Sequence, residues 1–164
     1  MIKKIELTHK GKKVTGRQIV VTSEFETNIE NIWCKIQDVD SLREICNPRA
    51  SFVFCDDSLL VWEEGKSFLL KVYLHKIIPL GKHTLNMIKI DKKSREIVSN
   101  EHNKAVQIWN HYIKMEDVHG STTRYTDVVD LYAGFLTPVI AWWSLKFYKH
   151  RQRKWQKIAR TLFL

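Results

Sequence analysis

The sequence predicts an α+β domain in which a curved antiparallel sheet of about seven strands wraps around one long C-terminal helix. Three observations lead to this prediction. Apolar and polar residues alternate over most of the chain after Pro48, which indicates strands. The connections between these strands are short, which makes neighbouring strands antiparallel. The chain ends in a long amphipathic segment that can cover one face of the sheet.

A strand and two short helices are predicted in the first part of the chain. The strand covers residues 16–27, where β-branched residues alternate with polar ones. Asn28 is the predicted N-cap of the first helix, whose apolar face consists of Ile29, Ile32, Trp33 and Ile36. The second helix ends before Asn47-Pro48 and carries apolar Leu42, Ile45 and Cys46. Residues 1–15 form a basic extension, either an extra strand or a flexible segment, of a single domain spanning residues 1–164.

Six further strands are predicted, at residues 50–56, 67–77, 83–91, 95–103, 106–117 and 121–133. Polar or glycine-containing turns are expected at residues 78–82, at 91–94 and around His119-Gly120. The loop at residues 58–66 has an apolar tip of Leu60, Val61 and Trp62. This tip is expected either to pack on the sheet edge or to form a lid over a cavity.

The terminal helix is predicted to begin with Thr137 as N-cap and Pro138 at its first position. Its apolar residues follow helical spacing, with a basic interruption near His150 and Arg151. One interpretation is a helix with one face on the sheet and a solvated opposite face. The alternative is that Trp142 and the basic residues of this helix make weak contact with an anionic membrane.

Charge and cysteine content exclude few classes of protein. The net charge of +9 fits a solvated surface better than a dedicated nucleic-acid site, which we regard as unlikely. Cys34, Cys46 and Cys55 are odd in number and lack CxxC spacing, which predicts free thiols in a reducing cytoplasm. No apolar leader follows the N-terminus, and the apolar run at residues 134–145 is too short to span a bilayer. A cytoplasmic location is therefore expected.

Motifs for metal or cofactor binding are missing from the sequence. The histidines show no HxxxH or HxH spacing, and no GxSxG or glycine-rich phosphate loop occurs. We therefore predict no metal ion and no cofactor.

Strand parity places a polar cluster on the inner face of the sheet. Trp109, His111, Ile113 and Met115 share one face of their strand, and Asp127 shares a face with Tyr125, Val129 and Leu131. A register with Met115 opposite Thr123 sets His111 opposite Asp127, about 5 Å apart. Glu101 is expected near Gln107 and diagonal to Trp109.

Three interpretations of this cluster remain open. It could be structural, because buried polar groups must be paired. It could orient a ligand on an apolar wall. In its strongest form, His111 would act as a general acid or base together with Asp127 or Glu101.

Several segments resemble a known family. These are WEEGKSFLLKVYL, IPLGKHTLNMIKID, REIVSNEH, WNHYIKME, TRYTDVVDLYAGFLTP and FYKHRQRKWQKIA. They are similar to bacterial polyketide cyclase/dehydrase-like proteins of the START-like, or SRPBCC, superfamily. The resemblance covers nearly all of the chain after Gly16. It implies a helix-grip fold with an apolar cavity between the sheet and the terminal helix, and it leaves function open.

The leading functional hypothesis is a non-enzymatic binder of a hydrophobic small molecule or lipid. The alternatives are a cyclase or dehydratase that uses His111, and a basic module for nucleic acid or an anionic membrane. The predicted ligand-binding residues are Trp62, Phe68, Leu70, Val72, Leu74, Leu85, Met87, Glu101, Gln107, Trp109, His111, Tyr125, Asp127, Val129, Trp143 and Phe147.

Overall fold

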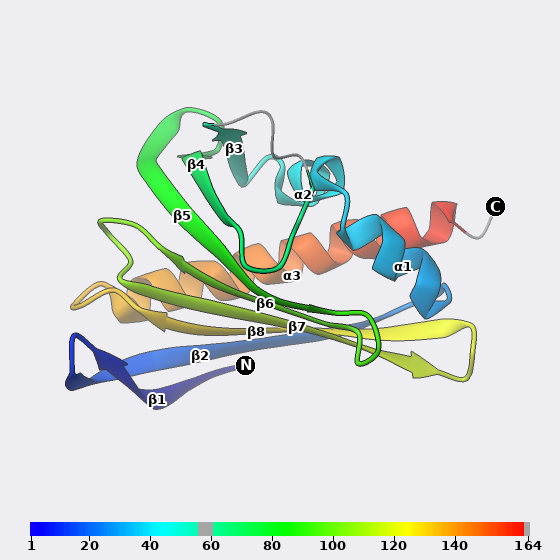
Figure 1. The fold of residues 1–164 in the computed structure, drawn as a ribbon, viewed down its shortest axis with the longest axis horizontal. Helices are drawn as coiled ribbons and strands as arrows, with labels where there is room; N and C mark the ends of the chain where they lie inside the picture. The colour runs from blue at the N-terminus through cyan, green and yellow to red at the C-terminus, as the bar shows by residue number, and fades with distance from the viewer. Residues whose placement is uncertain (56–60, 163–164) are drawn as a thin grey trace.

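The computed structural model describes residues 1–55 and 61–162. These residues form one eight-stranded antiparallel sheet and three helices (Figure 1). The strands are β1 (Ile2–His9), β2 (Lys12–Phe25), β3 (Ala50–Phe54), β4 (Ser67–Leu74), β5 (Ile78–Asp91), β6 (Glu96–His102), β7 (Ile108–Val118) and β8 (Thr122–Tyr132). The helices are α1 (Ile29–Ile36), α2 (Val39–Cys46) and α3 (Thr137–Thr161). The predicted fold class is confirmed, and the eighth strand is β1, which lies within residues 1–15.

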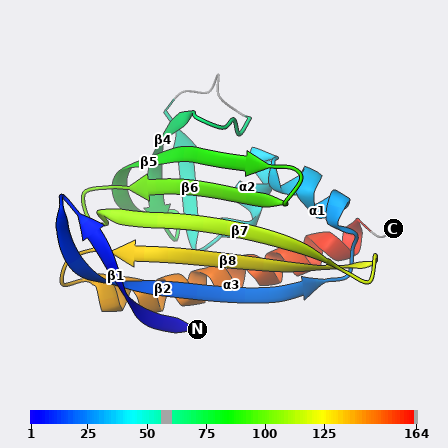
Figure 2. The same cartoon turned by 60° about the horizontal axis from the view of Figure 1, so that its bottom comes forward.

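The strands lie in the order β1-β2-β8-β7-β6-β5-β4-β3. Figure 2 shows β5, β6, β7, β8 and β2 side by side, with α3 running behind them. The early strand β2 pairs with the last strand β8, so the sheet brings the two ends of the chain together. The helix that follows β8 therefore returns across the inner face of the sheet.

The two short helices begin where the sequence predicts. The side chain of Asn28 accepts a hydrogen bond from the backbone N–H of Asn31 at 2.9 Å, which caps α1. Asp38 caps α2 in the same way through the N–H of Asp40, at 3.0 Å. These caps satisfy backbone donors that have no partner inside the helix.

The start of α3 differs from the prediction by one residue. Leu136 is the N-cap, without a side-chain hydrogen bond, and Thr137 is the first helical residue. The hydroxyl of Thr137 accepts from the N–H of Ala133 at 2.9 Å and donates to the carbonyl of Gly134 at 2.6 Å. Thr137 thus stabilises the turn between β8 and α3 instead of capping the helix.

One stripe of α3 is buried against β2 and β8. Its members follow the spacing of three or four residues that keeps side chains on one face: Ala141, Ser144, Tyr148, Gln152, Trp155 and Ala159. Small residues in this stripe let the helix approach the sheet closely. The helix consequently covers the β2–β8 part of the inner face, and α2 lies near β3 at the other edge of the sheet (Figure 1).

The turn predicted at residues 78–82 is wrong. The chain reverses at His75 and Lys76, whose φ angles of 48° and 68° are left-handed, and β5 already begins at Ile78. Pro79 and Gly81 lie inside β5, next to an irregularity in its pairing with β4. Proline is tolerated near a strand start, and Gly81 adopts a φ of 84° beside the irregular pairing. Both residues therefore mark a bulged strand and not a turn.

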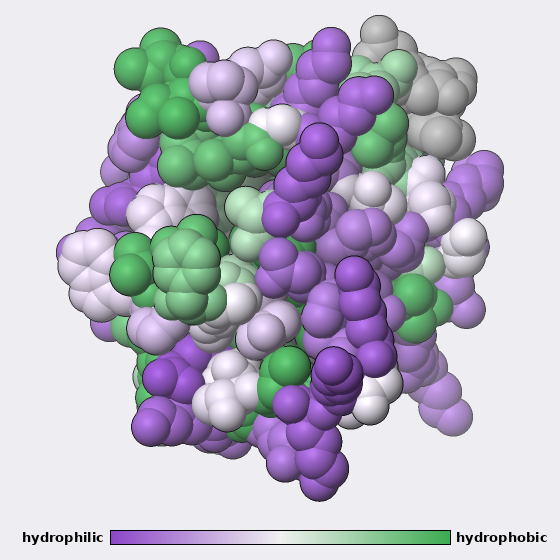
Figure 3. Space-filling model, turned by 90° about the vertical axis from the view of Figure 1, so that its left-hand side faces the viewer, coloured by the Kyte–Doolittle hydropathy of each residue, from purple (hydrophilic) through white to green (hydrophobic). Residues whose placement is uncertain are grey.

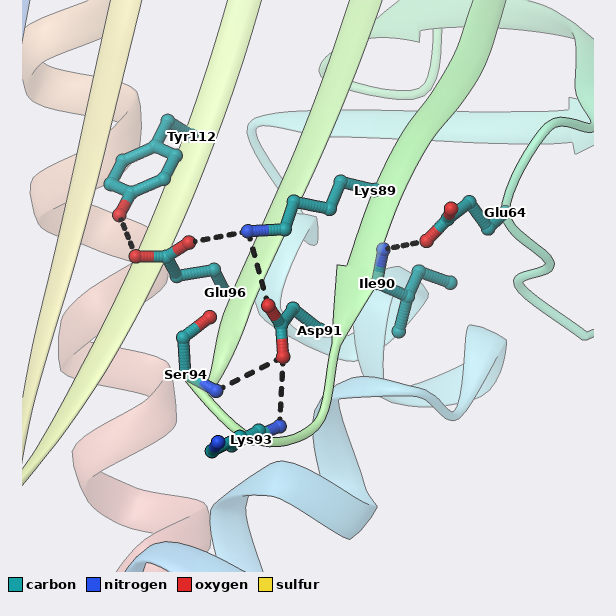
Figure 4. Close-up of polar contacts among 8 residues, drawn as sticks. All are labelled: Glu64, Lys89, Ile90, Asp91, Lys93, Ser94, Glu96 and Tyr112. Carbon is teal, nitrogen blue, oxygen red and sulfur yellow. Dashed lines mark hydrogen bonds and ion pairs between the residues drawn. The ribbon is translucent and has the colours of Figure 1, made fainter.

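The predicted turn at residues 91–94 forms and is held by polar contacts (Figure 4). The carboxylate of Asp91 accepts hydrogen bonds from the backbone N–H groups of Lys93, at 2.9 Å, and Ser94, at 3.0 Å. The Lys89 ammonium lies 3.1 Å from Asp91 and 2.9 Å from Glu96. These contacts fix the β5–β6 hairpin and hence the register of two strands that line the site.

Candidate functional site

A cavity of about 400 Å³ lies between α2, α3 and the inner face of strands β3–β7. Most of the side chains that line it are apolar. The volume falls in the range of about 300–1,000 Å³ that is typical of small-molecule sites. Three lining residues are also exposed: Leu80 of β5, Val139 of α3 and Ala105. The mouth of the cavity therefore lies beside these residues.

Many of the predicted ligand-binding residues lie on the cavity wall. They are Trp62, Leu70, Val72, Leu74, Leu85, Met87, Glu101, Trp109, His111, Trp143 and Phe147. Strand parity placed the residues of β4–β7 on this face, and helical spacing placed those of α3. Their location is therefore observed, whereas their contact with a ligand stays a prediction.

Five predicted residues lie off the wall: Phe68, Gln107, Tyr125, Asp127 and Val129. The three from β8 are buried under α3, because the helix rests directly on that strand. Phe68 packs against Trp62, with ring centroids 5.0 Å apart. Gln107 precedes β7, and its side-chain amide is directed to the carbonyl of Lys104, 3.4 Å away. The prediction assigned these inward-facing residues to the cavity wall. It did not account for the part of the sheet that α3 covers.

Trp62 belongs to an aromatic cluster at the β3–β4 edge. Its ring lies 5.0 Å from Phe68 and 6.0 Å from Phe54, and only 8% of the residue is exposed. Its position favours the packed alternative over a lid. Val61 beside it is exposed, and Leu60, the remaining residue of the predicted tip, lies outside the described residues.

The predicted contact between His111 and Asp127 is present in a different register. Met115 pairs with Tyr125 and His111 with Val129, so the predicted alignment of β7 with β8 was wrong by two residues. A shift of two keeps every side chain on its face. His111 Nε2 therefore still reaches Asp127 Oδ1 diagonally, at 2.7 Å.

Asp127 is enclosed by hydrogen-bond donors. Tyr125 donates to its Oδ1 at 3.3 Å, and Gln152 Nε2 donates to its Oδ2 at 2.9 Å. Burial favours the neutral acid, but the hydrogen bond from His111 and the nearby charge of Arg151 hold the pKa of Asp127 below its usual value. An ionised Asp127 only accepts hydrogen bonds, so Nε2 of His111 carries the proton.

A second polar group lies on the wall around Glu101. Its carboxylate is 2.8 Å from His83 Nε2 and accepts a hydrogen bond from the Ser99 hydroxyl at 2.8 Å. Asn103 Nδ2 lies 3.2 Å from His83 Nδ1. Burial opposes ionisation of Glu101, yet the hydrogen bond and charge of His83 keep the pKa of its carboxyl below the usual value. Glu101 pairs with Trp109 directly across the strands, whereas the prediction placed Glu101 diagonal to Trp109, so that alignment was wrong.

Comparison with solved structures identifies the fold. A START superfamily protein from Mycobacterium smegmatis superposes with a TM-score of 0.68 at 10% identity, over 88% of this chain and 98% of its own. The chain has the START-like, helix-grip fold. A second Mycobacterium smegmatis protein matches with a TM-score of 0.66 at 14% identity, over 86% of this chain and 89% of that one. A Bacillus thuringiensis protein matches with a TM-score of 0.64 at 15% identity, over 87% and 98%. No family model and no curated protein matches the sequence.

Two α3 residues complete the polar part of the cavity and were missed as site residues. Trp109 Nε1 donates to the Tyr148 hydroxyl at 3.2 Å, and the His111 ring lies 5.0 Å from the Tyr148 ring. Arg151 lines the cavity with its guanidinium carbon 4.9 Å from the same ring centroid. Arg151 lies three positions after Tyr148 and four after Phe147, so helical spacing places it on the same side of α3 as these two residues. This spacing could have identified Arg151 as a site residue, although its charge placed it in the predicted basic interruption of the helix.

Within the described ranges, no cluster of three or more His, Cys, Asp or Glu side chains could hold a metal ion. Of the helices in residues 1–55 and 61–162, none combines the length and hydrophobicity that crossing a bilayer requires.

Proposed function

We propose that the protein binds a hydrophobic small molecule or lipid in this cavity, for transport or sequestration. The observation that carries the proposal is an apolar cavity of about 400 Å³ with a few convergent polar groups. Transfer of apolar ligand surface from water to such a wall is favourable by roughly 25 cal/mol per Å². The START-like fold supports the proposal, because the long sheet extends past the area that one helix can cover.

Native mass spectrometry of freshly purified protein tests this function. We expect a lipophilic molecule to co-purify with the native chain. Val72 faces the cavity, and Leu69 on the same strand is exposed. Val72→Trp fills cavity space and should abolish co-purification, whereas Leu69→Trp should retain it. The proposal fails if no lipophilic mass is found in any preparation and the delipidated chain binds neither a long-chain acid nor an alcohol.

We further propose that an anionic membrane surface supplies the ligand. Exposed apolar residues occur in the two segments that contain Leu80 and Val139 of the mouth: Ile77, Ile78, Leu80, Phe135, Leu136, Val139 and Trp142. Figure 3 views the end of the molecule where α3 begins and shows apolar side chains gathered there among hydrophilic ones. No acidic residue occurs at positions 65–90 or 133–164, so the segments around the mouth carry only positive charge. Apolar side chains with neighbouring cations suit the interface of an anionic bilayer.

Acid–base catalysis of the cyclase or dehydratase type is a second candidate, which one observation favours. Nδ1 of His111 makes no hydrogen bond within the described chain, and His111 lines the cavity. A histidine with one nitrogen on a carboxylate and the other directed to a ligand is suited to proton transfer. The test compares turnover of the co-purified molecule by the native chain and by His111→Ala. Turnover by neither would leave binding as the function.

A further inference from the structure

Arg151 is a cation buried inside an apolar cavity. It projects from the middle of α3, and only 5% of the residue is exposed. The guanidinium packs over the rings of Tyr148 and Phe147, with its central carbon 4.9 and 5.9 Å from their centroids. Burying a charge is unfavourable unless the charge is paired.

No atom of residues 1–55 or 61–162 accepts a hydrogen bond from this guanidinium. Nε is enclosed and lacks an acceptor, and no ion pair links Arg151 to a carboxylate. The indole N–H of Trp155, also on the cavity wall, is a second buried donor without an acceptor in the same part of the chain. A guanidinium has five N–H donors and no acceptor. This part of the cavity wall therefore presents several N–H donors that have no acceptor.

The surrounding groups compensate the charge of Arg151 only in part. Burial raises the pKa of the Cys46 thiol to about 11, and it raises the pKa of both Tyr125 and Tyr148 well above the usual value. These three groups are therefore neutral near pH 7. Asp127 is ionised, but its oxygens already accept from His111, Tyr125 and Gln152, and it offers Arg151 long-range attraction only.

We propose that the ligand is an amphipathic anion whose carboxylate head binds Arg151 while its apolar chain fills the rest of the cavity. This inference rests on the proposed function and names its ligand class. The planar guanidinium matches a carboxylate through two parallel N–H···O bonds. Apolar residues of α2 and β4–β5 that line the rest of the cavity receive the chain: Leu42, Ile45, Leu70, Val72, Leu85 and Met87.

The rival arrangement is a cationic ligand. Glu101 on the wall and Asp127 behind it are both held ionised, and each could attract an ammonium group. Each already accepts hydrogen bonds on both of its oxygens: Glu101 from His83 and Ser99, and Asp127 from the groups named above. Arg151 is the charged group whose hydrogen bonds remain unmade, so the cavity favours an anion.

Calorimetric titration of the delipidated chain with three probes of equal chain length tests the inference. The probes are dodecanoate, dodecan-1-ol and dodecyltrimethylammonium. We expect dodecanoate to bind at least tenfold more tightly than either of the others. A neutral apolar cavity would give the reverse order for acid and alcohol, because a carboxylate is harder to desolvate than a hydroxyl. Equal binding of acid and alcohol, or preference for the ammonium, overturns the inference and leaves hydrophobic binding intact. Binding of no probe, without a co-purified ligand, overturns the function itself.

Substitution of Arg151 locates the head group. Arg151→Met should weaken dodecanoate binding roughly 10- to 100-fold, the factor expected for charged hydrogen bonds, with little change for dodecan-1-ol. Arg153→Met, an exposed arginine on the same helix, is the control and should change neither affinity. The ligand-free Arg151→Met variant should melt no lower than the native chain, because it loses a buried charge that lacks a hydrogen-bond partner. A marked fall in its melting temperature with unchanged dodecanoate affinity would assign Arg151 a structural role instead.

Discussion

Asp127 connects three elements through one side chain. It accepts hydrogen bonds from His111 on β7, Tyr125 on β8 and Gln152 on α3, and it is 1% exposed. Gln152 Nε2 also donates to the carbonyl of Val21 on β2, at 2.8 Å. The carboxylate therefore fixes the helix against the two strands it covers. This geometry gives the His111–Asp127 pair a structural role whether or not His111 also touches a ligand.

Replacement of this carboxylate should show a defined pH dependence. Asp127→Asn should lower the free energy of unfolding by about 3 kcal/mol at pH 7, because it removes the buried anion that His111 pairs with and that attracts Arg151 at longer range. The folded-state pKa of Asp127 lies below its ordinary value, so its stabilising contribution is present above about pH 4 and is lost as the pH falls through the folded pKa. Denaturant unfolding of both proteins from pH 7 to pH 3 should therefore show a difference that shrinks below about pH 4.

Asp130→Asn is the matched control for this experiment. Asp130 lies on the opposite face of β8 and accepts from Gln18 Nε2 at 2.8 Å, which an amide oxygen can also do. Little change in stability is expected. A difference between the native chain and Asp127→Asn that stays constant over the whole pH range would contradict the assigned ionisation of Asp127.

The pairing of His111 with Asp127 could be predicted because it depends on parity. Inward-facing residues of two adjacent strands stay on the same face under any shift of two, and an imidazole reaches a diagonal neighbour. The register itself could not be predicted. It depends on the β7–β8 turn, where His119 and Gly120 both adopt left-handed φ angles, and on Gly134 and Thr137 beyond β8.

At the scale of elements, the β1–β2 hairpin depends on one glycine. Gly16 of β2 is buried opposite Ile5 of β1, and a Cβ there would lie 2.5 Å from Leu7 Cδ1 and 2.8 Å from the Leu131 carbonyl oxygen. The second contact is with backbone, which cannot move aside cheaply. Glycine in a strand often marks such a close approach. The glycine is evident in the sequence, but no neighbouring residue indicates which strand would pack closely against it.

Gly16→Ala should therefore destabilise the protein through overpacking. We expect a loss of about 1–3 kcal/mol in the free energy of unfolding, together with faster amide exchange in β1. Thr15→Ala, an exposed neighbour on the same strand, should have little effect on either quantity. If Gly16→Ala matches Thr15→Ala in urea unfolding and in hydrogen exchange, the close packing of β1 on β2 does not contribute to stability.

The residues of α3 show why the site was only partly predictable. Phe147 and Trp143 were found from helical spacing, whereas Arg151 was assigned to a basic interruption of the stripe. Whether a charged residue in an apolar stripe reaches solvent or a cavity depends on where the helix ends relative to the sheet. The same dependence explains why Tyr125 and Val129 were expected on the wall but lie beneath the helix.

At the scale of the whole molecule, the cavity results from unequal coverage of the sheet. Helix α3 rests on β2 and β8, and α2 stands over the β3–β4 edge, so the inner faces of β5–β7 lie beneath neither helix directly. The cavity opens beside the first turn of α3. There Phe135 and Trp142 are 91% and 55% exposed, and Lys146 Nζ lies 3.5 Å from the Trp142 ring centroid. The mouth of the cavity and the proposed membrane contact are therefore at the same end of the molecule.

Vesicle co-sedimentation tests that arrangement independently of the cavity. Phe135 and Trp142 do not line the cavity, so the double substitution Phe135→Ser and Trp142→Ser should leave the affinity for dodecanoate unchanged. It should weaken binding to phosphatidylcholine vesicles that contain phosphatidylserine by tenfold or more, since each large apolar side chain contributes roughly 1.5–3 kcal/mol when buried. Ile88 is an exposed apolar residue near the other end of β5, and Ile88→Ser is the control that should bind vesicles normally.

Added salt should weaken the interaction of the native chain with these vesicles, because the charges of the cations around the mouth are screened within about 10 Å at 0.1 M. Absence of vesicle binding at low salt would exclude membrane loading, and the protein would then take its ligand from solution.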